Sequence, residues 1–156
     1  MKQLLHILDQ VPEFQQLLDA LDAGRSPAAV SGLSPVHRAH FAAGIRRHWD
    51  CPVVMVCADE GEAERMARDL SFLTGGEVPV LAARSFLFHN IATVSRQWEH
   101  RRLRLLYRLT RGEIPCLVAT VEAPLQRTLP PEALERACML VNMLGCGKVV
   151  PGAYDN

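Results

Sequence analysis

Apolar residues recur along the chain in two patterns, short unbroken runs and stretches with helical spacing. The clearest run is 52–57, and residues 78–81 and 114–120 form runs of the same kind. Unbroken runs of this length are typical of strands covered on both faces, as in a parallel sheet. Pro79 has no amide hydrogen for a ladder bond, so we expect the second run at the edge of the sheet or at the start of a strand.

Helical patterns fill the segments between these runs. Ser34 followed by Pro35 predicts an N-cap and a first helical position, for a helix that extends to about residue 49. Asp59 predicts a second helix start, with Glu62 three positions later in a capping-box-like arrangement. Further helices are predicted before and after Pro12 and at residues 95–111, 123–126 and 130–137.

Two weaker patterns add candidate strands at 28–32, which enters a glycine turn, and at 138–141. Strands that alternate with helices at this spacing predict a three-layer α/β domain, with a mostly parallel sheet and helices on both faces. We divide the chain into N-terminal helices at 1–26, the α/β domain at 27–141 and a divergent C-terminal tail at 142–156.

Composition agrees with one ordinary domain. The chain has 156 residues, of which 49% are hydrophobic and 22% charged, close to the averages of globular domains. Lys plus Arg and Asp plus Glu both number 17, so the formal net charge is zero, which argues against a strongly basic, nucleic-acid-coating protein. The longest apolar run, 52–58, is far too short to span a membrane, and the N-terminus lacks a secretory leader pattern. We expect a cytoplasmic protein without a membrane partner.

Cysteine and histidine spacing predicts no metal site. The 6 histidines form no HxH or HExxH pair, and the 5 cysteines form no CxxC pair. An odd number of cysteines argues against a disulfide framework and favours a reducing compartment, so we expect the thiols as small buried apolar residues. Because G-x-S-x-G is absent as well, the sequence offers no nucleophile elbow. We therefore expect no catalytic residue, no metal and no cofactor.

The segment that begins at Gly32 has the layout of a Walker A phosphate loop that has lost its chemical groups. The pattern G-x-x-x-x-G-K-[ST] needs a second glycine, a lysine for the phosphates and a hydroxyl for Mg²⁺. Here His37, Arg38 and Ala39 replace those three groups. Arg38 can still pair with an anion at the helix start after Ser34, but Ala39 offers no oxygen to Mg²⁺. Two interpretations stay open, a tight turn of an α/β fold and a vestigial nucleotide site.

Three segments are expected to meet at one edge of the sheet. Residues 32–38, 57–59 and 120–122 each follow a predicted strand. In open α/β sheets, ligands bind at the carboxyl ends of the strands, so this edge is the place where a binding site is expected.

The helix predicted between Ser95 and Gly112 carries six arginines and one acid. Spacings of three and four place four of the arginines on one stripe. They are Arg101, Arg104, Arg108 and Arg111. The stripe is either a solvated face or a docking surface for an acidic partner or nucleic-acid phosphate. The acidic first helices of the same chain could also neutralise it.

Arg102 falls outside this stripe. Helical spacing places it in the apolar sector beside Trp98 and Leu105, where an unpaired charge is unfavourable. We therefore expect a partner for Arg102, either Glu99 one turn earlier or a residue at the carboxyl edge of the sheet.

Several blocks of the sequence resemble the N-terminal region of bacterial transcription-repair coupling factors, the Mfd family. In chain order the blocks are S-G-L-S at 31–34, D-E-G-E-A-E-R at 59–65, D-L-S-F-L at 69–73, S-R-Q-W-E-H-R-R-L at 95–103 and A-T-V-E-A-P-L-Q-R at 119–127. The resemblance extends over roughly residues 1–140. It implies a domain similar to the first domain of the excision-repair protein UvrB, with a phosphate loop that is degenerate in the coupling factors.

The resemblance implies a module of a repair protein and not a motor. The whole family protein recognises stalled RNA polymerase, displaces it as an ATP-dependent DNA translocase and recruits UvrA, through parts of the family chain that lie further on. Residues 142–156 depart from the family pattern, so we expect a fragment or a truncated form that is not itself an enzyme. The alternatives are a diverged P-loop nucleotide-binding protein, in which Arg38 replaces the lysine, and a stand-alone interaction domain that docks through the arginine stripe. Self-association is a further open possibility.

Overall fold

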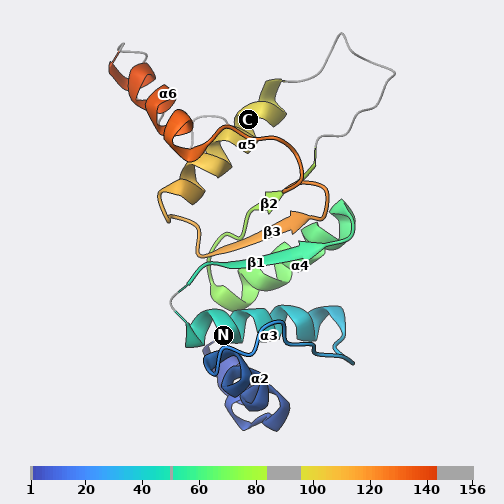
Figure 1. Cartoon of the computed structure of the whole chain (residues 1–156). Helices are drawn as coiled ribbons and strands as arrows, with labels where there is room; N and C mark the ends of the chain where they lie inside the picture. The colour runs from blue at the N-terminus through green and yellow to red at the C-terminus, as the bar shows by residue number, and fades with distance from the viewer. Residues whose placement is uncertain (1, 50, 84–95, 144–156) are drawn as a thin grey trace.

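The structure, a computed structural model, describes residues 2–49, 51–83 and 96–143. Its centre is a three-stranded parallel sheet in the order β1–β3–β2 (Figure 1). The strands are β1 (Val53–Cys57), β2 (Val80–Leu81) and β3 (Cys116–Thr120). The helices are α1 (Lys2–His6), the 3-10 helix η1 (Ile7–Gln10), α2 (Pro12–Asp22), α3 (Pro35–His48), α4 (Glu60–Thr74), α5 (Arg96–Thr110) and α6 (Pro131–Met143). The prediction of an α/β fold with a parallel sheet is confirmed.

Strand β3 is central and buried along its whole length. It pairs in parallel with β1 and with β2, and its middle residue Val118 is fully buried. The Val118 amide also donates to the Pro79 carbonyl at 3.1 Å. As Pro79 predicted, β2 lies at an edge of the sheet.

The two faces of the sheet are covered by different helices. Helices α3 and α4 cover one face (Figure 1), where alanines such as Ala39 and Ala43 let α3 approach closely. Helix α5 packs on the other face, where Leu105 contacts the cluster that contains Leu117 and Ala119 of β3. Strand β3 therefore lies between two apolar clusters, one on each face of the sheet, and contributes residues to both.

Strand β1 differs from its sequence prediction. Val54 is 54% exposed and Val56 is 56% exposed, so β1 is not covered on both faces. These side chains share the face of Leu117 and Ala119, their partners in the register, but the cluster under α5 does not extend to β1. An unbroken apolar run does not show whether a strand lies in the middle or at the edge of its sheet. For this reason the prediction that both faces of β1 are covered was wrong.

The N-terminal helices pack on α3. As predicted, the chain breaks before Pro12, and α2 buries Phe14 against Phe41 with ring centres 5.0 Å apart, edge to face. Asp22 at the end of α2 accepts hydrogen bonds from Trp49 Nε1 at 2.8 Å and from His48 Nε2 at 3.1 Å. These bonds, that from Trp49 first, hold the pKa of Asp22 below its ordinary value.

Both predicted helix starts are confirmed. The Ser34 hydroxyl accepts the His37 amide hydrogen at 3.4 Å, with Pro35 in the first turn of α3. The Asp59 carboxylate accepts the Glu62 amide hydrogen at 2.8 Å at the start of α4. Helix α4 ends at Thr74, and its C-cap residue Gly75 has a φ of 74°, in the left-handed region that favours glycine.

The strand predicted at 28–32 does not form. Residues 28–31 have no regular structure and are exposed, because Ala28 and Ala29 bring little apolar area to a sheet. The helix predicted at 123–126 is replaced by successive turns, since Pro124 has no amide hydrogen to continue a helical ladder.

The strand predicted at 138–141 is also wrong, because α6 continues to Met143. Ala137, Met139 and Leu140 are strong helix formers, and a helix satisfies its backbone locally without a neighbouring strand. The sequence also predicts an irregular, aromatic-rich stretch at 82–94. Ala82 and Ala83 have no regular structure, and residues 84–94 lie outside the described residues, as do Ser95, the first residue of the helix predicted at 95–111, and the tail from residue 144 onward.

The contact between α3 and the N-terminal helices gives a stability prediction. A Cβ at Gly44 would lie 2.6 Å from Leu8 Cδ1 and 2.7 Å from Phe14 Cζ, and both side chains are buried. We expect Gly44→Ala to lower the free energy of unfolding by about 1–3 kcal/mol through overpacking, measured by urea denaturation. The control is Gly76→Ala, where nothing lies within 4 Å, with an expected change within about 0.5 kcal/mol. Equal effects of the two substitutions would contradict this packing.

Candidate functional site

The carboxyl ends of β1 and β3 lie beside the N-termini of α3 and α4, as predicted. The Val121 amide after β3 donates to the Cys57 carbonyl at 2.9 Å. The Arg38 guanidinium in the first turns of α3 donates to the Glu62 carboxylate of α4 at 3.0 Å. The three segments expected at this edge are thus brought together.

Arg38 pairs with a carboxylate of its own chain. Glu62 Oε1 accepts from Arg38, and its other oxygen accepts the Ala58 amide hydrogen at 3.1 Å. The two side chains are 43% and 22% exposed, so the pair adds little to stability, of the order of 0–1 kcal/mol. An incoming phosphate at Arg38 would nevertheless meet the negative charge of this carboxylate.

Two other residues of the degenerate loop, Ser34 and Ala39, are engaged in structural contacts. The Ser34 hydroxyl caps α3 and also lies 3.1 Å from His37 Nδ1. Ala39 is fully buried in the cluster between α3 and the sheet. Gly32 has a φ of 80°, a Cβ at this position would have nothing within 4 Å, and no strand precedes it. In the described part of the chain, no group of three or more His, Cys, Asp or Glu residues could hold a metal ion.

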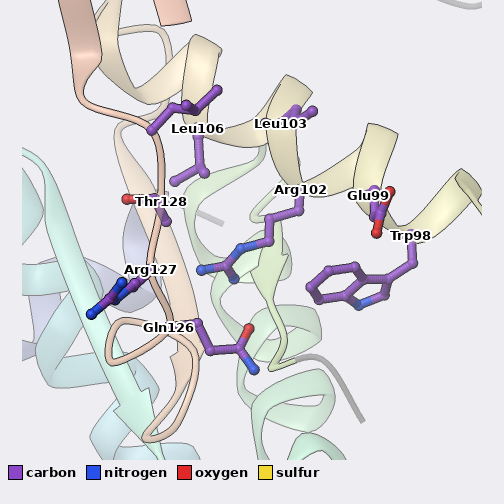
Figure 2. A pocket seen from close by; sticks show the side chains of 9 residues that line it. Trp98, Glu99, Arg102, Leu103, Leu106, Gln126, Arg127 and Thr128 are labelled. Atoms are coloured by element: carbon purple, nitrogen blue, oxygen red, sulfur yellow. The ribbon is translucent and has the colours of Figure 1, made fainter. Parts of the chain in front are cut away.

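A groove of about 510 Å³ lies between α5 and the connection that follows β3 (Figure 2). Figure 2 shows Arg102 extending from α5 into this groove, with the Trp98 ring beside it. The lining residues are Trp98, Glu99, Arg102, Leu103, Leu106, Gln126, Arg127, Thr128 and Leu129. Most of this lining is apolar, and Arg102 and Arg127 supply its positive charges.

Arg102 connects α5 to two strand ends. Its guanidinium donates to the Ala82 carbonyl after β2 at 3.3 Å and to the Ala123 carbonyl after β3 at 2.9 Å. The guanidinium carbon lies 5.7 Å from the centre of the Trp98 ring, a cation–π distance. Burial lowers the pKa of Arg102. The expectation of a partner at the carboxyl edge of the sheet is confirmed, and the partners are backbone carbonyls.

Glu113 forms ion pairs with two of the four arginines of the stripe. Arg108 and Arg111 lie 3.7 Å and 3.1 Å from the Glu113 carboxylate. Arg101 and Arg104 are exposed and make no ion pair with another described residue. Helical periodicity places the whole stripe on the flank of α5 opposite the groove.

The acidic first helices do not neutralise the stripe, contrary to that sequence expectation. Asp9 pairs with Arg47 and Asp22 pairs with His48. Both basic residues belong to the end of α3, which packs on the N-terminal helices. These two acids are therefore paired on the far side of the sheet from α5 (Figure 1).

The prediction that the cysteine thiols are buried is confirmed for only some of them. Cys57 and Cys116 are buried, and burial raises the pKa of both thiols. Cys51 is exposed, because it lies in the turn before β1 and not within the strand. Cys138 and Cys146 were predicted to be buried, and their side chains lie outside the described part.

Sequence reasoning missed the partners of the key arginines. Glu62 was noted as a capping residue, but nothing in the sequence signals that it also binds Arg38, 24 positions away. The Ala82 and Ala123 carbonyls carry no residue-type signal, because every residue has a carbonyl. Glu113 was the one partner with a local signal, since it follows Arg111 by two positions.

The described structure is thus an α/β domain. The loop at the start of α3 lacks the second glycine, the lysine and the hydroxyl residue of a Walker A loop. The chain is 26% identical over 134 residues to the transcription-repair-coupling factor of Bacillus subtilis (strain 168), covering 85% of this chain. It is 33% identical over 132 residues to that of Myxococcus xanthus, covering 80% of this chain. The chain is a relative of the transcription-repair-coupling factors, which confirms the resemblance seen in the sequence.

The similarity covers a small part of those proteins. The aligned region is 11% of the length of each of the two relatives. No protein-family model matches the chain, and no solved structure matches it. Among the described helices, none is long and apolar enough to cross a bilayer.

The contacts of Arg102 predict its contribution to stability. We expect Arg102→Met, which keeps an unbranched side chain, to lower the free energy of unfolding by about 1–3 kcal/mol, because the Ala82 and Ala123 carbonyls lose their donor. Arg104→Met on the exposed flank is the matched control and should change it by less than about 0.5 kcal/mol. Urea denaturation of both variants measures the difference. If Arg102→Met is as stable as the control, the link between α5 and the strand ends has no energetic role.

Proposed function

We propose that this chain is a non-catalytic α/β module of a transcription-repair coupling factor, acting in nucleotide excision repair coupled to transcription. The similarity to two such factors over most of the chain supports the family context. The observation that carries the non-catalytic role is the ion pair between Arg38 and Glu62 at 3.0 Å. The residue in the place of the Walker A lysine is bound to a carboxylate.

Nucleotide hydrolysis also needs an oxygen for Mg²⁺ after that position. Ala39 has none and is fully buried, so no side chain of the loop can hold the metal where P-loop enzymes hold it. A phosphate near Arg38 would be exposed to repulsion from Glu62, and from Asp59 at the start of α4. We infer that the loop is the relic of a nucleotide site.

The finer fold assignment is part of the same proposal. We propose a UvrB-like domain at 27–141, with the degenerate phosphate loop at Gly32, Ser34, Arg38 and Ala39 and with N-terminal helices at 1–26. The parallel order of β1, β3 and β2 and the positions of α3 and α4 support it. RNA polymerase, UvrA and DNA are the partners that we propose for the protein complex in which the module acts, in the cytoplasm.

Calorimetry with MgATP tests the loss of nucleotide chemistry. We expect no saturable heat for the chain, because neither the Mg²⁺ oxygen nor a free cation is present in the loop. Glu62→Gln releases Arg38 from the carboxylate while the amide oxygen still accepts from Ala58, and we expect this variant to stay silent too. Saturable, Mg²⁺-dependent heat that is lost in Arg38→Ala would instead favour the diverged nucleotide-binding protein.

A second candidate function is docking through α5. It is supported by Arg101 and Arg104, which are exposed and make no ion pair with another described residue. Of the acids in the N-terminal helices, Asp9 and Asp22 are paired with α3 instead. Such a stripe attracts an acidic partner through long-range electrostatics.

Salt dependence tests the second candidate. We expect labelled poly-glutamate to bind the chain in low salt and to lose at least about tenfold in affinity at about 300 mM salt, where screening shortens the Debye length. Charge reversal by Arg104→Glu and Arg108→Glu should remove the binding, measured by fluorescence anisotropy. Arg68→Glu on α4 is the control for a charge reversal away from the stripe. Binding whose affinity does not change with salt would count against docking through the stripe. So would binding that Arg68→Glu weakens as much as the charge reversals in the stripe do.

A further inference from the structure

Strand β1 has an outer edge to which no other described segment is bonded. β1 is the end strand of the sheet and pairs only with β3. The bonds between the strand residues and other described segments involve the β3 side, such as that of the Val53 amide with the Pro115 carbonyl at 3.0 Å.

The backbone groups on that edge belong to two residues. In a parallel ladder, alternate residues bond to the same neighbour, so Val53, Met55 and Cys57 bond to β3. The N–H and C=O groups of Val54 and Val56 therefore point outward. The same two residues are the valines whose side chains are 54% and 56% exposed.

This edge lacks the features that protect edge strands from pairing. Natural edges carry charged side chains, prolines or bulges within the strand, and β1 has the sequence VVMVC. A regular, uncharged edge with exposed valines is a template for another strand. The opposite edge of the sheet is protected, because β2 has two residues and follows Pro79.

We infer that two copies of this chain associate through β1, antiparallel across a twofold axis, to form one continuous six-stranded sheet. The edge is self-complementary, since it has no charge to repel its own copy and presents apolar side chains on the face left uncovered. The protected edge at β2 closes the assembly at two copies, so a dimer and not a filament results. This inference goes beyond the proposed function and does not depend on it.

The structure also fixes the register of the pairing. If the twofold axis were closer to the start of β1, Pro52 would have to pair with the second copy, and it has no amide hydrogen to donate. If the axis were closer to the end of β1, Ala58 would have to pair with the second copy, but its amide hydrogen is already donated to Glu62 at 3.1 Å. With Met55 on the axis, Val54 lies opposite Val56 of the second copy, and every outward N–H of the strand finds a carbonyl.

A strand edge of five residues is a small interface. Specific interfaces that bury less than about 1,200 Å² belong to weak and transient complexes. We therefore expect a monomer–dimer equilibrium that shifts toward dimer as the concentration of the chain rises. Sedimentation velocity over a hundredfold range of concentration measures it.

Charge substitutions test the surface. We expect Val54→Lys with Val56→Lys to abolish dimerisation, because each ammonium would lie opposite another across the axis. An equimolar mixture of this variant with the Val54→Glu, Val56→Glu variant should restore a heterodimer, which an unfolded variant cannot do. Val36→Lys, at a valine of α3 that is 60% exposed, is the control and should dimerise as the unsubstituted chain does.

Cross-linking tests the register. In a Cys51→Ser background, Val54→Cys and Val56→Cys chains are mixed and oxidised. Residues opposite each other in a hydrogen-bonded antiparallel pair have Cα atoms about 5.5 Å apart, within the disulfide range, so the mixture should form a covalent dimer while each variant alone forms at least about tenfold less. A chain that stays monomeric at all concentrations would overturn the inference. Dimers that survive the lysine substitutions, or equal cross-linking of each variant alone, would overturn the β1 interface.

Discussion

Burial of β3 on both faces is the constraint on which the rest of this structure depends. Val118 faces α3 and α4, and Leu117 with Ala119 faces α5. Because the backbone of a buried strand must be hydrogen-bonded on both sides, β1 and β2 are held in register beside it. The two apolar clusters on either side are connected through this one strand, and each helix layer is stabilised by its contact with one of them.

Three arginines that could bind an anionic ligand are each bound by an acceptor of the same chain. Arg38 is bound by Glu62, Arg102 by the Ala82 and Ala123 carbonyls, and Arg111 by Glu113. In each case a position that could bind an anionic ligand is engaged by an acceptor of the same chain. The contacts of Arg38 and Arg102 connect separate elements of the fold, and of the two only the partly buried contacts of Arg102 are expected to contribute substantially to stability.

Uncovered surface, in contrast, lies at β1 and on the outer flank of α5. Val54 and Val56 are exposed because the cluster under α5 includes Leu81 of β2 and residues of β3 but no residue of β1. On α5, Arg101 and Arg104 are exposed and make no ion pair with another described residue. The region aligned with the two relatives is 11% of their length, and within it the uncharged strand β1 and the arginine-rich flank of α5 are the surfaces that the described residues leave uncovered.

The sequence by itself determined the local features. Ser34 and Asp59 begin helices, Pro79 places β2 at an edge, and β3 is an unbroken buried run, because capping, missing donors and hydrophobic burial act within a few residues. Tertiary structure decided the rest. Whether residues 28–32 and 138–141 form strands depends on whether a neighbouring strand is available, and the partners of Arg38 and Arg102 lie more than 19 positions away along the chain. Pairings of this kind leave no pattern in one sequence, because their geometry exists only after the helices have packed on the sheet.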